Sequence, residues 1–403
     1  FTEGKTPELY VGVLPEEVEK ELDLVVLSPG VPVDLPLVLR LKEAGLPIWG
    51  EIELAYRCKK GDVLAITGTN GKTTTTALLG EIMKTAYPHV HVVGNIGIPY
   101  TGVVTEDTDD TVTVAEISSF QLETIDAFCP CVSAILNITP DHLNRHHTME
   151  NYIAAKLSIA KNQGPEQTCV LNYEDEVLRE FGKNIVPKVV YFSSLRKLDQ
   201  GIYLDGDQII LKTEKEEIPI VKTGELKILG RHNHENVMAA AAMAYYAGVS
   251  VESIHKSVCE FVAVPHRIEY VTEKNGVAYY NDSKGTNPDA AIKGIQAMNR
   301  PTLLIGGGYD KESSYDEWIE SFDGKVRYLV LIGQTKEKIK AAAERLGFTD
   351  IILCEDLKEA VQICAEKANP GDAVLLSPAC ASWGQFDNYE QRGDMFKEYV
   401  KAL

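Results

Sequence analysis

The chain has 403 residues, of which 44% are apolar and 25% charged, a composition typical of a globular protein with two or three domains. Lysine and arginine number 40 against 59 acidic residues, so the net charge of −19 argues against a non-specific nucleic-acid binder. An anionic ligand therefore requires a local positive pocket.

The cysteine pattern and the hydropathy bear on the cellular compartment. Eight cysteines are scattered without any C-x-x-C pair, and Cys129-Pro-Cys131 is too tight and isolated for a zinc framework. This pattern indicates reduced thiols. No run of 18 apolar residues occurs, and the stretch FTEGKTPELY lacks the basic and apolar regions of a signal peptide. We expect a cytoplasmic protein that contacts neither membrane nor nucleic acid.

The first 50 residues predict one βαβ unit. LDLVVLSPGVP (22–32) is typical of a strand that ends in a Pro/Gly turn. PLVLRLKEAGLP (36–47) has helical spacing and a glycine stop.

The second region, 51–264, opens with a phosphate-binding pattern. VLAITGTNGKTTTTALLG (63–80) predicts a strand, a tight glycine turn and a helix start, although Ile66 stands where the usual loop has glycine. Glycines let backbone N–H groups approach phosphate oxygens, and the helix N-terminus favours anions. Lys72 can reach the β- and γ-phosphates, and the Thr73 hydroxyl can bind Mg²⁺. The loop indicates a nucleoside triphosphate.

Further strands follow in this region, at 111–118, 132–139, 168–172 and 188–193. Alternating residues at 201–220 predict hairpins around Asp205-Gly206, and 233–248 predicts an alanine-rich helix that stops at Gly248. Glu116 follows a strand, where it is either a metal ligand or a surface charge. In NITPDHLNRHH, the spacing does not favour zinc, and we expect His146 and His147 at the surface.

The third region, 265–403, contains strands that run into polar or glycine-rich loops. They lie within AYYNDSKGTNP, PTLLIGGGYD, YLVLIG, DIILCED and AVLLSPACAS. In open α/β sheets, ligands gather at such carboxyl-end loops. The chain thus predicts three α/β domains, at 1–50, 51–264 and 265–403.

Nine motifs occur in an order that resembles the Mur ligases of peptidoglycan synthesis. They are GTNGKTTT, GNIGIP, EISSFQLE, NITPDHLNRH, YIAAKLSIA, GRHNHENVMAA, PHRIEYV, NDSKGTNPDA and LLSPACASWGQFDNYEQRG, within about residues 23–403. SSFQLE, NDSKGTNP and the last motif are most specific to the member that adds D-glutamate. The resemblance implies a partial Rossmann-like N-terminal domain, a central P-loop ATPase-like domain and a Rossmann-like C-terminal domain.

The resemblance also implies a reaction and its residues. An ATP-dependent ligase would join D-glutamate to UDP-N-acetylmuramoyl-L-alanine through an acyl phosphate, as a monomer.

Catalytic positions would be Lys72, Glu116, His142 and Lys156. Two Mg²⁺ ions would be held by Thr73, Glu116, His142 and Lys156, the last as a carbamate. ATP would contact Gly68, Thr69, Asn70, Gly71, Lys72, Thr73, Thr74, Asn233, Asn236, Arg267 and Asp282. The UDP-sugar would contact Ser28, Pro29, Gly30, Asn95 and His142. D-Glutamate would contact Lys284, Thr286, Lys311, Ser382, Trp383, Asn388 and Tyr389.

Alternatives stay open at this level. Without the resemblance, Lys156 is a solvated helix lysine, and Trp383 and Tyr389 are equally well core aromatics. FTEGKTPELYVG (1–12) lacks the strand, glycine-rich turn and helix that open the family's first domain, so we expect part of that domain to be missing from this sequence. The competing functions are another Mur-type ligase, folylpolyglutamate synthase, or a nucleotide-binding module that has lost ligation.

Overall fold

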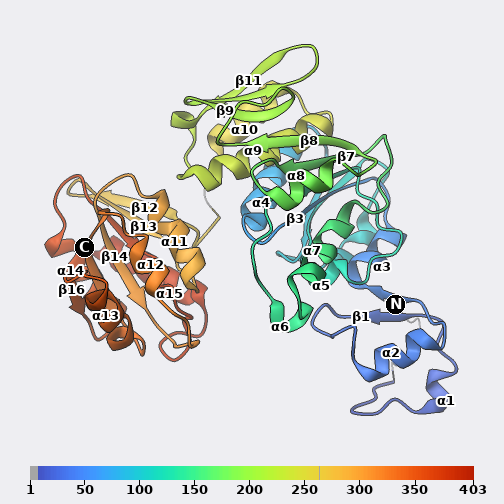
Figure 1. Ribbon diagram of the computed structural model, residues 1–403, viewed down its shortest axis with the longest axis horizontal. Helices are drawn as coiled ribbons and strands as arrows, with labels where there is room; N and C mark the ends of the chain where they lie inside the picture. Colours follow the sequence, from blue (N-terminus) through green and yellow to red (C-terminus); the bar gives the residue numbers. More distant parts are fainter. Residues whose placement is uncertain (1–7, 263) are drawn as a thin grey trace. The chain divides into compact units, whose positions relative to one another are not determined.

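The computed structural model describes residues 8–262 and 264–403, apart from the side chain of Asn144. Its internal contacts divide the chain into two compact units. Figure 1 labels their helices and strands and colours them along the sequence. The first comprises the N-terminal segment up to Lys72, Met83–Tyr191 and Met243–Val249. The second comprises Thr73–Ile82, Phe192–Ala242 and Ser250–Leu403. The stretch 1–7, part of the N-terminal expectation above, lies outside the described residues.

The N-terminal segment forms the expected βαβ unit. Strands β1 (Val25–Leu27) and β2 (Ile48–Gly50) pair in parallel, with Val25 opposite Ile48. Between them, α2 (Pro36–Glu43) starts with proline in its first turn, where a missing N–H costs nothing, and buries one stripe of side chains. The short helix α1 (Glu16–Glu19) precedes β1.

Five parallel strands organise the rest of the first unit. Their order across the sheet is β7-β6-β3-β5-β4. Their bounds are β3 Asp62–Thr67, β4 His89–Gly94, β5 Thr111–Glu116, β6 Val132–Ile135 and β7 Thr168–Asn172. The helices of this unit are α3 Glu51–Cys58, α5 Ser119–Leu122, α6 Leu143–His146, α7 Met149–Leu157 and α8 Glu176–Gly182, with 3₁₀ turns at Tyr100–Gly102, Val104–Glu106 and Ser158–Ala160. Strands β5, β6 and β7 are buried throughout, as parallel strands covered by helices must be.

The second unit starts at the end of β8 (Lys188–Ser193), whose last two residues pair with β9. Strands β9 (Gly201–Asp205), β10 (Gln208–Lys212) and β11 (Glu217–Lys222) form antiparallel hairpins, and the 3₁₀ turn η4 (Thr223–Glu225) follows. The helices here are α9 Arg231–Tyr246, α10 Val251–Glu260 and most of α4 Lys72–Met83.

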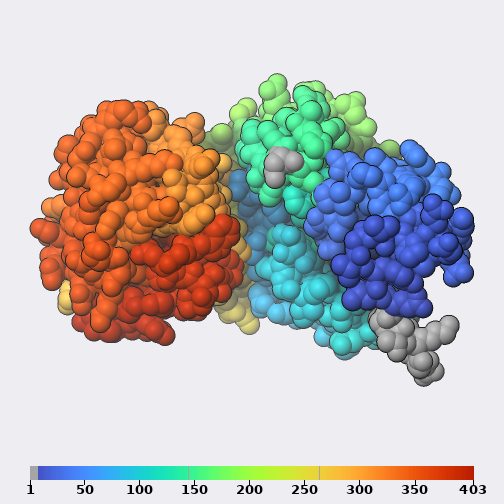
Figure 2. All heavy atoms as spheres, turned by 90° about the horizontal axis from the view of Figure 1, so that it is seen from below, coloured from blue at the N-terminus to red at the C-terminus, as the bar shows by residue number. Residues whose placement is uncertain are grey.

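A six-stranded sheet organises the C-terminal part of the second unit. Its order is β12-β13-β17-β14-β15-β16, with only β12 antiparallel. The strands are β12 Glu269–Lys274, β13 Val277–Asn281, β14 Thr302–Gly307, β15 Val326–Ile332, β16 Ile351–Leu353 and β17 Ala373–Leu376. The helices are α11 Pro288–Ala297, α12 Asp316–Glu320, α13 Lys336–Arg345, α14 Leu357–Lys367 and α15 Tyr389–Ala402. A hydrophobic cluster lies on each face, and this part packs as one body, orange to red in Figure 2.

Most expected elements are present. The hairpin turn falls at Asp205-Gly206, where glycine has φ of 60°, and α9 is followed by Gly248 with φ of 90°. Strand β4 was not among the expected strands. Its sequence, HVHVVG, is short and ends at a glycine turn, so it is easily taken for the connection to the GNIGIP motif.

The structure also bears on the expectations about the cysteines and about membrane-spanning helices. All eight cysteines are free thiols in the structure, as their spacing predicted. Within the described ranges, no helix combines the length and the apolar character needed to cross a bilayer.

Glu53 fixes how α3 joins the sheet of the first unit. Its buried carboxylate accepts hydrogen bonds from the backbone N–H groups of Asp126, Ala127 and Phe128 at 2.8, 2.9 and 3.0 Å. Arg57 also donates to it at 2.7 Å. The Glu53→Gln variant should lower the free energy of unfolding by about 2 kcal/mol, because an amide N–H₂ cannot accept these bonds. Urea unfolding and hydrogen exchange at the three amides measure this; Glu43→Gln, an exposed change, is the control.

Candidate active site

The candidate site is built where parallel strands of the first unit end. Strand β3 pairs on one side with β5, placing Ile66 opposite Glu116, and on the other with β6, placing Thr67 opposite Ile135. Strand β4 places Gly94 opposite Glu116. Because the carboxyl ends of parallel strands share one edge, four loops converge there. They are the phosphate loop, Gly94-Asn95, Glu116-Ile117 and Asn137-Ile138.

The phosphate loop is held in its conformation by side chains from the loop after β6 and from α7. Gly68 and Gly71 adopt φ of 148° and 86°, which glycine adopts without strain. The Asn137 side chain accepts from the Asn70 N–H at 2.8 Å and donates to the Asn70 carbonyl at 3.0 Å. The Thr69 hydroxyl meets the Tyr152 hydroxyl at 2.9 Å. Neither Asn137 nor Tyr152 was singled out in the sequence, although Asn137 directly follows a strand beside the loop.

Two lysines meet one backbone carbonyl in this loop. Lys72 donates from Nζ to the Gly68 and Thr69 carbonyls at 2.9 and 3.0 Å. Lys156, on α7, donates from Nζ to the same Gly68 carbonyl at 2.8 Å. The Lys72 ammonium thus places positive charge at the turn where phosphate oxygens would lie, which supplies a local field that the acidic chain lacks overall.

Lys156 is buried, not solvated. Its side chain is 1% exposed and lies 4.7 Å from the centroid of the Tyr152 ring. Burial, and then the neighbouring charge of Lys72, lower the pKa of Lys156 to about 7. The alternative of a solvated helix lysine is therefore wrong, and much of this amine is neutral at neutral pH.

Glu116 presents one carboxylate oxygen that fits a metal ion. The side chain is 2% exposed, so its alternative role as a surface charge is wrong. Asn95, expected at the sugar substrate, donates from Nδ2 to Oε1 at 2.8 Å and orients the carboxylate. Oε2 is buried and has no hydrogen-bond partner among the described residues. A buried carboxylate oxygen without a partner is costly unless a cation occupies the position beside it, so the site fits Mg²⁺.

The histidine-rich segment divides into exposed and buried members. His142 precedes α6 in the left-handed region, with φ of 52°, and its side chain is 51% exposed beside Asp141. His147 is exposed, as expected. The expectation of a surface position is wrong for His146, which is buried and lies 2.9 Å from the Ser119 hydroxyl. The His146 ring packs in the core against Tyr152. The position of this histidine in the sequence therefore follows from the packing of α6.

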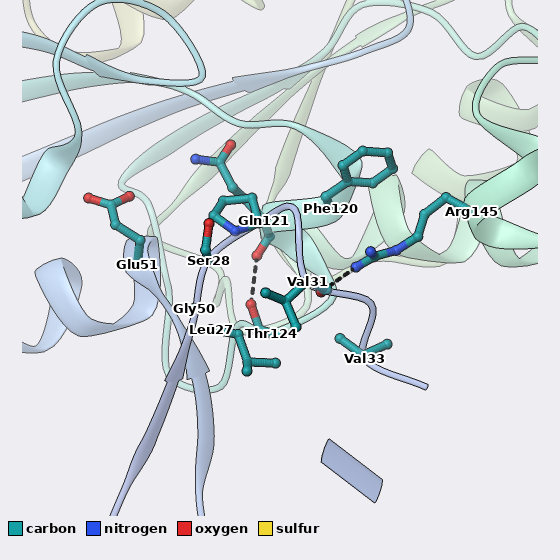
Figure 3. Close-up of a pocket in the computed structure, with 11 residues that line it drawn as sticks. Leu27, Ser28, Val31, Val33, Gly50, Glu51, Phe120, Gln121, Thr124 and Arg145 are labelled. Carbon is teal, nitrogen blue, oxygen red and sulfur yellow. Dashed lines mark hydrogen bonds between the residues drawn. The ribbon is translucent and has the colours of Figure 1, made fainter. Parts of the chain in front are cut away.

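A small pocket lies between the N-terminal segment and α5 (Figure 3). Its walls include Ser28 and Pro29, which were expected at the sugar substrate, together with Phe120 and Gln121. Arg145 closes one side, donating to the Val31 carbonyl at 2.9 Å and to Glu123 at 2.6 Å. The remaining wall residues are Leu27, Val31, Val33, Gly50, Glu51 and Thr124. No sequence pattern singles out Arg145.

In the second unit, the expected ATP residues contact the phosphate-loop helix. Thr75 on α4 donates to the Asn236 side chain at 3.2 Å, and Asn236 donates to the Asn233 side chain at 3.0 Å. Asn233 in turn donates to the Leu229 carbonyl at 2.7 Å. Thr73 and Thr74, at the start of the same helix, are buried.

Asp282 is buried and Arg267 is partly buried in this unit. Burial is the main cause that raises the pKa of Asp282 to about 7, and its Oδ2 accepts from the Ser377 hydroxyl at 2.7 Å. Nε of Arg267 is buried without a hydrogen-bond partner among the described residues. Burial, and then Lys293 and Arg267, lower the pKa of His232 to about 4. The surroundings of Arg267 therefore fit an anionic ligand that would pair with its guanidinium.

The residues expected at D-glutamate lie beyond the carboxyl ends of three strands: Lys284 and Thr286 follow β13, Lys311 follows β14, and Ser382, Trp383, Asn388 and Tyr389 follow β17. Lys284 stacks over the Tyr389 ring at 5.4 Å, and Lys311 over the Trp383 ring at 5.2 Å. Trp383 is 55% exposed, so its alternative role as a core aromatic is wrong. It borders a cavity of about 320 Å³. Ser382 is buried.

The remaining members of this set have local backbone roles. Thr286 donates its N–H to the Lys284 carbonyl at 2.9 Å. The Asn388 side chain accepts from the Gln391 N–H at 2.7 Å and caps α15.

Arg392 joins the loop after β13 to the loop after β17 and was missed in the sequence. It is fully buried on α15. Its guanidinium donates to the Ser283 hydroxyl and carbonyl at 2.9 and 2.8 Å, and to the Cys380 carbonyl at 3.2 Å. The available signal was a single arginine at helical spacing with Phe396 and Val400 in an otherwise apolar stripe.

Family models match both parts of the chain that carry these loops. One described as the Mur ligase middle domain covers residues 66–244, and one described as the Mur ligase, glutamate ligase domain covers residues 266–380. These matches span more than half of the sequence. The chain belongs to the Mur ligase family.

Individual relatives sharpen this assignment. Over 396 residues the chain is 59% identical to the UDP-N-acetylmuramoylalanine--D-glutamate ligase of Lachnoclostridium phytofermentans, covering 98% of this chain and 87% of that protein. It is 55% identical to the protein of the same name from Lachnospira eligens, covering 98% and 88%. The resemblance found in the motifs is confirmed.

Solved structures share the fold. UDP-N-acetylmuramate-alanine ligase MurC from Thermotoga maritima aligns with a TM-score of 0.65 at 20% identity, covering 94% of this chain and 85% of that one. MurF ligase from Thermotoga maritima in complex with ADP aligns with a TM-score of 0.63 at 18% identity, covering 95% and 97%. The expected multi-domain α/β class is confirmed.

The Asn137 contact generates a test of the phosphate loop. The Asn137→Ala variant removes both bonds to Asn70, each worth about 0.5–1.5 kcal/mol, so nucleotide affinity should fall roughly tenfold. Calorimetric titration with ADP measures this. Asn184→Ala, which removes a bond on the exposed end of α8, should leave the affinity unchanged. Equal affinities for the two variants would mean that the loop keeps its shape without the two hydrogen bonds from Asn137 to Asn70.

Proposed function

We propose that this chain is the ATP-dependent ligase that joins D-glutamate to UDP-N-acetylmuramoyl-L-alanine in peptidoglycan synthesis. The observation that carries the proposal is 59% identity, over nearly the whole chain, to a relative of that name. The phosphate loop with its two lysines, Lys72 and Lys156, supports it independently.

The chemistry explains why a phosphate loop serves amide formation. A free carboxylate is a poor acceptor for an amine, because its oxygen is a poor leaving group. Transfer of the γ-phosphate to the terminal carboxylate of the UDP-sugar substrate gives an acyl phosphate. The amine of D-glutamate attacks the carbonyl carbon, the C–O bond to phosphate breaks, and inorganic phosphate leaves. The protein must hold the reactants together and neutralise charge at the transferring group.

Residues of the phosphate loop, of the helix start after it and of the segments that follow the neighbouring strands are assigned to the phosphoryl-transfer half. Lys72 lies at the turn of the loop and would contact and neutralise the β- and γ-phosphates. Thr73, Glu116 and His142 would hold Mg²⁺, for which the unpartnered Glu116 Oε2 is the supporting observation. When bound, the ion would neutralise charge on the phosphate oxygens. Asn95 would keep the Glu116 carboxylate in position.

Lys156 is assigned as a carbamate that completes this set. Only a neutral amine adds CO₂, and the pKa of about 7 supplies one at neutral pH. Addition of CO₂ to the neutral amine forms an N–C bond and releases one proton. Counted from the ammonium form, two protons are lost, so a cation becomes an anion with oxygen donors. Such hard oxygen donors suit Mg²⁺.

The acceptor half is assigned to the C-terminal loops. D-Glutamate carries two carboxylates, and Lys284 and Lys311 supply cations on separate loops, with Thr286 and Ser382 as hydroxyl donors. The exposure of Trp383 and the cavity beside it support ligand binding at this edge of the sheet. Asn233, Asn236, Arg267 and Asp282 are assigned to ATP, and Ser28, Pro29 and Gly30 to the UDP-sugar.

The proposed domains are 1–50, 51–264 and 265–403, in the order UDP-sugar, ATP and amino acid. Support comes from the strand pairing, since β1-β2 and β12–β17 form separate sheets. We place the protein in the cytoplasm, which its free thiols support, and keep the monomer as an expectation from the family resemblance.

Acceptor choice separates the proposal from its rivals. With ATP and UDP-N-acetylmuramoyl-L-alanine, phosphate release should depend on D-glutamate and should not be supported by L-glutamate or L-lysine. A phosphate-release assay with each amino acid measures this. Equal turnover with another amino acid would indicate a different Mur-type ligase or folylpolyglutamate synthase. ATP binding without acceptor-dependent turnover would indicate a module that has lost ligation.

Lys156 gives the sharpest test of the catalytic assignment. Lys156→Ala should lower turnover by roughly 10²-fold or more, the scale for losing a preorganised charged group, and acetate should restore part of it. Lys156→Arg should stay inactive because a guanidinium remains cationic. ¹³C-bicarbonate NMR of the wild type should give a carbamate signal that grows as the pH rises through about 7, where the amine loses its proton.

The control for this experiment is Lys183→Ala, which changes an exposed lysine on the surface of the first unit. It should keep both the turnover and the carbamate signal. Near-wild-type turnover of Lys156→Arg would overturn the carbamate assignment and leave Lys156 as a positioning charge on the Gly68 carbonyl.

A further inference from the structure

Three metal-ligating side chains meet in the second unit on residues that the proposed function does not use. His255 and Cys259 lie one turn apart on α10, and Glu225 ends the 3₁₀ turn η4. One ligand atom from each lies within 4.8 Å of the others, and Cys259 Sγ is 3.8 Å from His255 Nε2. Thiolate and imidazole ligands of a tetrahedral zinc ion, at about 2.3 and 2.0 Å from the metal, are separated by a similar distance.

The imidazole is already oriented for a metal. His255 Nδ1 lies 2.7 Å from the Ile220 carbonyl oxygen, which can only accept, so Nδ1 carries the proton. Nε2 is therefore the nitrogen with a free lone pair, and it is the one that faces Cys259. Metal-binding histidines are generally anchored in this way through the other ring nitrogen.

The acidic partner is also held in place. The Glu225 carboxylate accepts from the Lys222 N–H at 2.9 Å through Oε2, which fixes its direction at the end of β11. This contact joins the turn to the same strand that carries the Ile220 carbonyl. Two of the three ligands thus have their positions set by backbone groups of one strand.

The charges that act on Cys259 are mainly negative and come from the carboxylates of Glu225 and Glu260, whereas Lys227 opposes them. A divalent ion relieves the repulsion between carboxylate and thiolate, and the thiol proton leaves to solvent as the metal binds.

We propose that Glu225, His255 and Cys259 form a zinc site that joins η4 to α10. One sulfur, one nitrogen and one oxygen donor suit a borderline-soft divalent ion such as Zn²⁺ and not Mg²⁺, which prefers oxygen. Three protein ligands leave a fourth position for water. Because it joins two elements of one unit, bound zinc stabilises that unit according to its concentration.

Cobalt substitution tests the site on the whole chain. The purified protein is treated with chelator, supplied with excess Mg²⁺ to occupy oxygen-rich sites, and titrated with Co²⁺. A sulfur-to-cobalt charge-transfer band should saturate at one ion per chain, and added Zn²⁺ should remove it. The band reports a thiolate ligand, and no cysteine is assigned to the proposed active site of amide formation.

Variants assign the band to these residues. Cys259→Ser should abolish it, whereas His255→Gln and Glu225→Gln, which remove direct ligands, should weaken cobalt binding by more than the roughly 10–100-fold typical of losing an outer-shell partner. Cys58→Ser, which changes an exposed free thiol in the first unit, is the matched control and should keep it. Glu225 is exposed, so its variant keeps the fold and circular dichroism verifies this. A wild type without a thiolate band, or a band that survives in Cys259→Ser, would overturn the zinc site.

Discussion

The parallel pairing of β3 between β5 and β6 is the constraint on which the site depends. It fixes Glu116 opposite Ile66 and brings the loop that starts at Gly68 to the same edge. A shift of one residue would turn every side chain of β5 to the other face and remove the carboxylate from the loop. The buried strands specify the register, because their side chains must meet the covering helices on both faces.

The site holds several groups that do not favour the fold by themselves. Lys156 is buried with a lowered pKa, one oxygen of Glu116 has no partner among the described residues, and the same is true of the Arg267 Nε. Each such group costs stability in the ligand-free chain. Such costs concentrate at functional sites, where a ligand or a modification supplies the missing partner.

Arg392 shows how one buried charge can be retained without such a cost. All three of its guanidinium nitrogens have acceptors, two on Ser283 and one on Cys380. The bonds tie the loop after β13 to the loop after β17, so the relative position of Lys284 and Ser382 follows from the core of the C-terminal sheet. A lysine there could not make the same planar set of bonds.

The sequence by itself determined the α/β class, the phosphate loop, most strands and the family, because each depends on local patterns or on ordered motifs. It also indicated Lys72 and Glu116, since both follow strands at the loop-bearing edge. Only the tertiary structure decided that Lys156 and His146 are buried, and that Asn137 and Arg392 hold loops in place. It alone brought Glu225 to His255 and Cys259. Burial and side-chain partners depend on packing between segments far apart in the chain, which no local pattern encodes.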